Sequence, residues 1–150
     1  MRTVIQRVKR ASVSIDNEVH SSIEGGMLIF LGIEENDTPD DMEWMCKKIA
    51  HLRIFDDERK IMNLSLSDIH GSCLVVSQFT LYASTKKGSR PSYFRAAMPD
   101  TAIPFYEKFV KILEGETQLP VESGVFGADM QIELLNDGPV TIIIDSKYRE

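Results

Sequence analysis

Short runs of consecutive apolar residues, each bounded by turn-forming or polar residues, restrict the fold of this chain more than any other feature. Residues 27–31 (Met-Leu-Ile-Phe-Leu) follow a Gly-Gly pair, and residues 73–76 (Cys-Leu-Val-Val) end in a polar segment. A short apolar run of this kind is typical of a strand buried on both faces. We therefore expect a sheet with these two segments at its centre.

Further strands are indicated by shorter or alternating patterns. Polar and apolar residues alternate over residues 12–15 and 19–23, and the Asp16-Asn17 pair between them is typical of a hairpin turn. The remaining strands are expected over residues 3–8, 53–55, 121–126, 130–135 and 140–144, with a polar turn over residues 56–58.

Two segments have the periodicity of helices. The first begins at Thr38, which can cap a helix, and Pro39, whose fixed φ suits the first turn. Its apolar positions fall on one face: Met42, Met45, Ile49 and Leu52. The second is expected to run from a cap at Thr101 to Leu113 and to end at Gly115. The sequence thus predicts one α/β domain over residues 1–150, with many strands and two helices.

Composition narrows the class of protein. The 150 residues are 43% hydrophobic and 27% charged, which is enough for one domain with a core. No apolar run approaches the roughly 20 residues needed to span a bilayer. Cys46 and Cys73 lie in apolar surroundings, as reduced thiols of a cytoplasmic protein do. His20, His51 and His70 lie apart without ligand spacing, so we expect no metal and no cofactor.

Two polar segments follow apolar runs and stand out. The first is Ser77-Gln78-Phe79-Thr80, and the second is Asn136-Asp137-Gly138-Pro139-Val140-Thr141. Read alone, the second segment is typical of a turn. A Gly-Pro pair also presents backbone carbonyls with no side chain in front of them, on a rigid and chiral surface. Such a surface suits a site that judges the handedness of a small substrate, although the sequence leaves the isomer of this peptide bond open.

Together these segments resemble the D-aminoacyl-tRNA deacylase family, and the resemblance covers essentially the whole chain. The other segments that carry it are Met1-Arg2-Thr3-Val4-Ile5-Gln6-Arg7-Val8, Asn63-Leu64-Ser65, Lys87-Gly88-Ser89-Arg90-Pro91-Ser92 and Phe126-Gly127-Ala128-Asp129-Met130. Ser89 departs from the pattern, in which asparagine is commoner. The resemblance implies a barrel-like pair of sheets with two helices packed outside, and a homodimer. It also implies a cytoplasmic hydrolase that edits D-aminoacyl-tRNA by cleaving its ester.

The catalytic segment is expected at Ser77, Gln78, Phe79 and Thr80. We assign the N–H groups of Phe79 and Thr80 as donors to the developing oxyanion, with the ribose hydroxyl of the RNA assisting the attacking water. The resemblance implies that Gly138 and Pro139 of one subunit enter the neighbour's pocket. There they would hold the α-amino group and reject L side chains by collision with backbone. Glycyl-tRNA has no side chain to reject and should also be cleaved.

The remaining site residues are weaker assignments. Phe126 and Met130 are expected to border the terminal adenine, although both could equally be core residues. A net charge of −6 argues against bulk attraction to nucleic acid, but local basic groups occur. Of these, Lys86, Lys87 and Arg90 are expected to contact tRNA phosphates. The basic residues among the first ten are interpreted as ordinary solvated surface, and Gln78 and Arg7 as residues that could orient the site or complete the dimer.

Several alternatives remain open from the residues. Thr80 could act as a nucleophile, but a Ser-His-Asp triad lacks support because only His70 lies near Ser77 in sequence and no G-x-S-x-G elbow occurs. The hydroxyls of Ser77 and Thr80 could simply satisfy backbone groups at a strand end. The Gly138-Pro139 pair could be a trans hairpin turn. Other functions are a nucleic-acid-binding module without chemistry and a general hydrolase of small esters.

Overall fold

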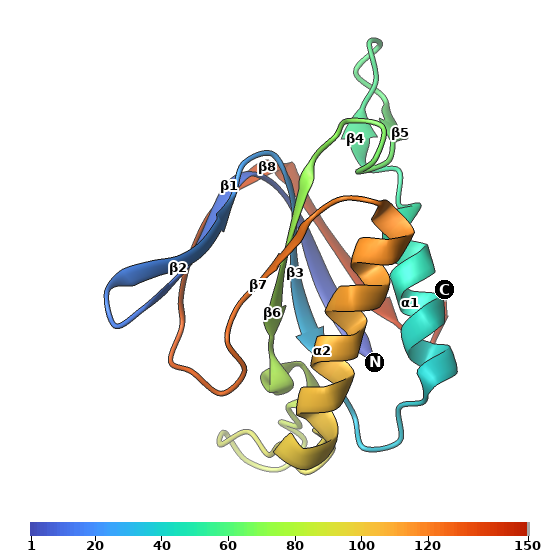
Figure 1. Cartoon of the computed structure of the whole chain (residues 1–150). Coiled ribbons are helices and arrows are strands. Elements are labelled where there is room, and N and C mark those ends of the chain that lie inside the picture. The colour runs from blue at the N-terminus through green and yellow to red at the C-terminus, as the bar shows by residue number, and fades with distance from the viewer. Residues whose placement is uncertain (150) are drawn as a thin grey trace.

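A curved, barrel-like sheet of six strands is covered by two helices in the computed structural model, which describes residues 1–149 (Figure 1). The strands of the sheet are β1 (Arg2–Ile15), β2 (Glu18–Ile23), β3 (Gly26–Gly32), β6 (Ser72–Ser77), β7 (Val121–Ser123) and β8 (Gln131–Asp145). The helices are α1 (Pro39–Ala50) and α2 (Pro99–Thr117), and η1 (Phe79–Tyr82) is a short 3-10 helix. A separate hairpin of β4 (Phe55–Asp56) and β5 (Met62–Leu64) projects from one end (Figure 1). The expected fold class is confirmed.

The sheet is mixed, with the two apolar strands inside it. The order is β2-β1-β3-β6-β7, and β8 pairs with the other edge of β1. The β3–β6 and β6–β7 pairs are parallel, whereas β1 is antiparallel to each of its neighbours. Both β3 and β6 are flanked on two sides, which confirms the central position predicted for them. Asp16 and Asn17 turn the β1–β2 hairpin with φ of 51° and 65°, the left-handed conformation that a tight hairpin requires.

Two predicted interruptions of strands were wrong. Residues 3–8 and 12–15 belong to the single strand β1, and residues 130–135 and 140–144 belong to β8, apart from Met130. Both strands continue because they pair with each other on either side of a local register shift. Such irregularities bend a strand without ending it, so a break in the apolar pattern was mistaken for the end of an element. The strand expected at residues 53–55 is β4, which keeps only Phe55 and takes in Asp56 from the predicted turn, and the strand expected at residues 121–126 ends at Ser123.

The start of α1 agrees with the sequence pattern. Thr38 accepts a hydrogen bond from the Asp41 amide while the Asp41 carboxylate accepts one from the Thr38 amide, which is a capping box. Met42, Met45 and Ile49 are fully buried against the sheet, whereas Leu52 lies beyond the end of the helix.

The predicted limits of α2 were wrong. The helix begins at Pro99, after Met98, and runs through Gly115 to Thr117. The Thr101 hydroxyl does not cap it but donates to the Glu35 carboxylate at 3.4 Å. No helix within residues 1–149 is long and apolar enough to cross a membrane.

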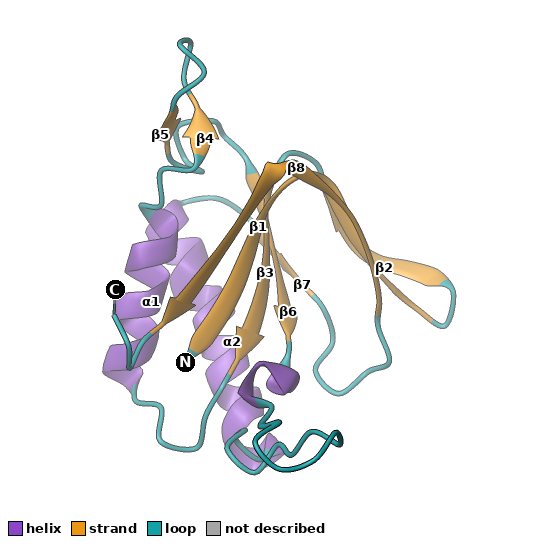
Figure 2. Ribbon diagram, turned by 180° about the vertical axis from the view of Figure 1, so that it is seen from behind, coloured by secondary structure: helices purple, strands orange, loops and turns teal. Residues whose placement is uncertain are grey.

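The core has two layers, one on each face of the sheet. Between the sheet and the helices lie residues such as Ile5, Ile29, Met45 and Phe109. A smaller cluster, which includes Leu28 and residues 74 and 76, lies on the opposite face where β2 and β8 curl away from the helices (Figure 2). The helices therefore cover one face only (Figure 2).

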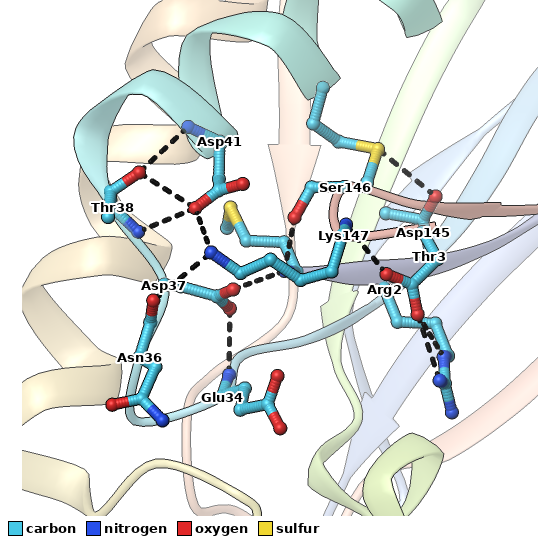
Figure 3. A network of polar contacts seen from close by, with 12 residues as sticks. Arg2, Thr3, Glu34, Asn36, Asp37, Thr38, Asp41, Asp145, Ser146 and Lys147 are labelled. Atoms are coloured by element: carbon cyan, nitrogen blue, oxygen red, sulfur yellow. Dashed lines mark hydrogen bonds and ion pairs between the residues drawn. The ribbon is translucent and has the colours of Figure 1, made fainter. Parts of the chain in front are cut away.

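A polar network ties both ends of the described chain to the start of α1 (Figure 3). The Lys147 ammonium pairs with the Asp41 carboxylate, and the Met1 amine pairs with Asp37 and donates to Ser146. Burial alone would raise the pKa of Asp41, but hydrogen bonds from Lys147 and Thr38 outweigh it and hold this pKa well below its usual range. The ionised carboxylate is therefore part of the folded structure.

Candidate functional site

A cavity of about 620 Å³ opens where β6 ends, and it brings together two of the predicted segments. Ser77, Gln78 and Phe79 form one part of its wall, and Phe126 and Met130 form another. The rest of the wall is made by Val76, Tyr93, residues 96–99, residues 127–129 and Ile132. Nearly fifty residues separate the two predicted segments in sequence, so only the fold places them side by side.

The end of β6 is held by its neighbour β3. The Gln78 amide donates to the Leu31 carbonyl at 2.7 Å, and the chain then turns into η1. Gly32 makes this close approach possible, because a Cβ there would lie 3.0 Å from the Leu81 Cβ and 3.2 Å from the Gln78 carbonyl oxygen. Residues 77–79 are therefore held in place both by the hydrogen bond to β3 and by the turn into η1.

Two backbone donors lie at the start of η1. Phe79 and Thr80 are its first residues, and the first N–H groups of any helical turn have no partner within it. Among the described residues neither amide donates to another backbone carbonyl. Phe79 lines the cavity and Thr80 follows it, so these unpaired amides lie at the wall of the cavity or next to it.

The side chains around this cavity offer little acid–base chemistry. Asp129 is its only acidic or basic lining residue, and no histidine or cysteine lines it within residues 1–149. Thr80 is not a lining residue, and its hydroxyl accepts a hydrogen bond from the Gln78 side-chain amide. His70 precedes the start of β6 whereas Ser77 ends it, which separates them by roughly 17 Å along the strand. A Ser-His-Asp triad is therefore excluded for Ser77 and His70.

Aromatic side chains from separate segments of the chain line the cavity. The rings of Phe79 and Tyr93 meet edge to face with centroids 5.0 Å apart, and Phe79 is 52% exposed. The ring of Phe126 lies 6.1 Å from that of Tyr106, whose hydroxyl donates to the Val75 carbonyl at 2.8 Å. That hydroxyl also bonds to the Gly124 carbonyl at 3.3 Å, which fastens the segment before Phe126 to β6.

The Gly138-Pro139 pair occupies a bulge in β8 rather than a hairpin turn. Gln6 pairs with Thr141 and Val8 with Asn136, so four residues of β8 face Arg7 alone. Both residues of the pair are exposed, their peptide bond is cis, and Gly138 has a φ of 129°. The alternative of a trans hairpin turn is thus excluded.

Arg7, on the neighbouring strand β1, holds this bulge in place. Its guanidinium donates to the Asp137 carbonyl at 3.0 Å and the Ile54 carbonyl at 2.7 Å, and it pairs with Asp56 at 3.2 Å. Arg7 is only 7% exposed. The interpretation of the N-terminal basic residues as ordinary solvated surface was therefore wrong for Arg7, because the carbonyls of Asp137 and Ile54 supply its guanidinium with acceptors.

Within one chain, the bulge lies away from the cavity. Ser77 pairs with Leu31, which in turn pairs with Thr3, so Ser77 and Thr3 lie at the same height along the sheet. The bulge lies at the height of Arg7. Four residues separate these levels, or roughly 13 Å along the strands, and three strand spacings separate β6 from β8, or about 14 Å across the curved sheet. Gly138 and Pro139 accordingly line no part of their own chain's cavity.

The predicted basic contacts lie on an exposed loop. Lys86, Lys87 and Arg90 lie within the loop that the Ser84–Ser92 bridge closes, and none of them lines the cavity. The nearby Arg95 behaves differently, because its guanidinium pairs with Glu34 at 2.6 Å.

Some lining residues were not assigned from the sequence. Tyr93 lies in the long loop between η1 and α2, and loops of that length are commonly functional. Asp129 lies within the segment 126–130 that carries the family resemblance. Residues 96–99 and Ile132 carried no signal, since their place depends on how α2 and β8 pack. No group of three or more His, Cys, Asp or Glu side chains in the described part of the chain is arranged to hold a metal ion.

Comparison with known proteins gives consistent matches. The family described as D-Tyr-tRNA(Tyr) deacylase matches residues 4–145. The D-aminoacyl-tRNA deacylase of Bacteroides fragilis (strain YCH46) is 58% identical over 150 residues, and that of Flavobacterium johnsoniae is 55% identical, each match covering 100% of both chains.

Solved structures also resemble this one. A chain described as c-Myc DNA Unwinding Element Binding Protein has a TM-score of 0.91 and 40% identity, with 97% of this chain and 98% of that chain covered. A probable eukaryotic D-amino acid tRNA deacylase has a TM-score of 0.80 at 16% identity, which shows a shared fold. That match covers 95% of this chain and 97% of the other.

Proposed function

The chain belongs to the D-Tyr-tRNA(Tyr) deacylase family, and from this premise we propose that it hydrolyses D-aminoacyl-tRNA to free D-amino acid and tRNA. The observation that carries this proposal is the single cavity shared by residues 77–79 and residues 126–130. It combines open backbone donors with aromatic walls and few ionisable side chains. Such a site suits a reactive ester that needs to be held and polarised more than it needs a catalytic base.

In the proposed reaction, the ester carbonyl oxygen lies against the amides of Phe79 and Thr80. Water attacks the carbonyl carbon, and the negative charge that develops on the oxygen is stabilised by these donors. The bond to the ribose oxygen then breaks, and this oxygen leaves with a proton. The neighbouring ribose hydroxyl positions the water, so that the reaction does not depend on a side-chain base.

The aromatic walls provide a place for the terminal nucleoside. Phe126 would offer a stacking face for the adenine and Met130 would border it. A Cβ on Gly124 would lie 2.6 Å from the Met130 sulfur, so a small residue at 124 makes room for that side chain. Lys86, Lys87 and Arg90 would contact phosphates from their exposed loop.

Chiral selection would come from a partner chain. The Gly138-Pro139 bulge is exposed and lies too far from its own cavity, but in a homodimer it can enter the cavity of the neighbour. Its carbonyls would hold the substrate's α-amino group, so that an L side chain collides with backbone and a D side chain points outward. Glycyl-tRNA escapes this exclusion and would be hydrolysed as well.

The test is deacylation of matched D- and L-tyrosyl-tRNA by the purified protein. We expect rapid release from the D ester and little from the L ester, and loss of release when the tRNA ends in 2′-deoxyadenosine. Hydrolysis of both enantiomers at equal rates would refute the chiral role. A monomer by light scattering that is fully active and selective would refute the shared site.

A second function has one observation in its favour. A protein with 40% identity and nearly full coverage is described as a DNA-unwinding element binding protein. If this chain only bound nucleic acid, D-tyrosyl-tRNA would form a complex with its ester intact. The same deacylation assay therefore separates the two functions.

A further inference from the structure

We propose that a groove between α1 and the adjoining parts of β1 and β8, which is lined by basic, aromatic and aliphatic side chains, binds the phosphate backbone of the tRNA acceptor arm. The inference rests on the proposed function and adds a contact surface to it. Two adjoining cavities of about 870 Å³ and 480 Å³ form this α1 groove, and they share Trp44, Lys48 and Leu52. Neither includes a residue assigned to the catalytic cavity or to the Lys86, Lys87 and Arg90 loop.

The charge of the α1 groove is opposite to that of the chain. Its charged lining residues are Arg2, Lys47, Lys48 and Arg53, with Asp145 as the single carboxylate. The rest of the lining consists of His51, two aromatic and several aliphatic side chains, the latter from β1, β8, η1 and Leu52. Arg2 already neutralises the Asp145 carboxylate at 2.8 Å. Within residues 1–149, no ion pair involves the three other cations. In a chain of net charge −6, this concentration of unneutralised positive charge is complementary to a phosphate backbone.

Aromatic side chains lie among these cations. The Lys48 ammonium is 5.7 Å from the centroid of the Trp44 ring, and the Arg149 guanidinium carbon is 4.3 Å from it. Tyr148 also lines the groove and is 69% exposed. Basic residues interleaved with exposed aromatic rings are typical of nucleic-acid-binding surfaces.

The α1 groove is continuous with the catalytic segment through η1. Leu81 lines the groove, while Phe79 of the same short helix lines the catalytic cavity. Arg2 links the two by donating to the Leu81 carbonyl at 2.9 Å. A tRNA whose 3′ end enters the catalytic cavity can therefore pass over η1 and place its nearest phosphates in the groove.

The structure also suggests how to separate binding from stability. Lys47 and Lys48 lie in the last turn of α1, where cations complement the helix dipole. A purely structural role predicts a lower melting temperature with unchanged affinity for tRNA. A phosphate-binding role predicts a change in KM that depends on salt.

The test compares a Lys47→Gln/Lys48→Gln variant with a Lys108→Gln/Lys111→Gln control. The control removes the same charge from exposed positions of α2 that line neither catalytic cavity nor groove. Each protein is assayed on D-tyrosyl-tRNA and on D-tyrosyl adenosine ester. For the first variant we expect KM for tRNA to rise about tenfold, and the slope of log KM against log salt to fall by about 1.8, as two lost phosphate contacts predict. Its kinetics on the adenosine ester should not change.

Several outcomes would overturn the inference. An unchanged KM for tRNA, or an equal rise in the α2 control, would show that the groove makes no specific contact. A changed oligomeric state with unchanged KM would make it a protein interface. If the unsubstituted protein cleaves the adenosine ester and only the KM prediction fails, the proposed function stands. If the unsubstituted protein cleaves neither substrate, the proposed function and the inference about the groove are both refuted.

Discussion

Arg7 donates a hydrogen bond from its Nε to the backbone carbonyl oxygen of Asp137 at 3.0 Å, directly before the exposed Gly138-Pro139 pair. The same guanidinium binds the Ile54 carbonyl, which leads into the β4–β5 hairpin. One buried side chain thereby connects β1, β8 and the projecting hairpin. The bulge is consequently held to the neighbouring strand by a guanidinium, a second nitrogen of which is fixed by the Ile54 carbonyl.

Replacing Arg7 by lysine keeps the positive charge but removes the planar guanidinium, which donates in several fixed directions. The substitution therefore tests the geometry of the hydrogen bonds separately from the charge. At least one buried carbonyl should lose its donor, which costs about 1–3 kcal/mol in the free energy of unfolding. The ratio of D- to L-tyrosyl-tRNA hydrolysis should fall, and urea unfolding and deacylation measure the two effects. Arg10→Lys, on an exposed part of the same strand, is the control. An unchanged ratio in Arg7→Lys would contradict a positioning role for Arg7.

Replacing Gly138 by alanine should distort the bulge. A Cβ there would lie 2.8 Å from the Val140 Cγ2 and 3.1 Å from the Arg7 Nη2, at a φ of 129° that side chains rarely adopt. We expect a loss of about 1–3 kcal/mol in stability and a marked fall in D-tyrosyl-tRNA hydrolysis. Gly115→Ala is the matched control, since a Cβ at that helical position meets nothing within 4 Å and should stabilise by about 0.5–1 kcal/mol. Normal activity of Gly138→Ala would argue against the proposed selection.

Thr80→Val tests the rival covalent mechanism. The Thr80 hydroxyl accepts from Gln78 and does not line the cavity, so its removal should leave single-turnover deacylation within about threefold of normal. Loss of a true nucleophile would lower the rate by orders of magnitude. A trapped acyl-enzyme seen by mass spectrometry would support the covalent route instead.

The ion pair at the start of α1 should make stability sensitive to acid. The folded pKa of Asp41 lies below its unfolded value of about 3.9, so the ionised form favours folding. This contribution is fully present well above pH 4 and is lost as pH falls from there toward the folded pKa. Asp41→Asn should lower the free energy of unfolding by about 1–3 kcal/mol at pH 7 and flatten its dependence below pH 5. Urea unfolding from pH 3 to 7 measures this, with the exposed Asp40→Asn as control; parallel curves for Asp41→Asn and the native protein would contradict it.

Both cysteines should be inert while the protein is folded. Burial raises the pKa of Cys46 and of Cys73 to about 12, so almost no thiolate exists at pH 8. Iodoacetamide should therefore modify neither thiol in the native protein and both in urea, as mass spectrometry can show. Rapid alkylation of the native protein would mean that α1, which holds Cys46, or β6, which holds Cys73, opens readily.

Local patterns in the sequence predicted the parts of the fold that depend on local physics. The buried strands β3 and β6, the Asp16-Asn17 turn and the Thr38 cap follow from apolar periodicity and from backbone preferences of single residues. The start of α2 was missed because the Thr101 hydroxyl binds Glu35, a distant residue that no local pattern reveals.

The sequence by itself therefore determined the family, the central strands and the segments from which the site is built, since these are written in short stretches of residues. Only the tertiary structure decided that residues 77–79 and 126–130 share a cavity, that β8 continues through Gly138-Pro139, and that Arg7 is buried beneath it. Each of these depends on the register between strands far apart in the chain. That register is set by how the whole sheet buries its apolar faces, which no single segment encodes.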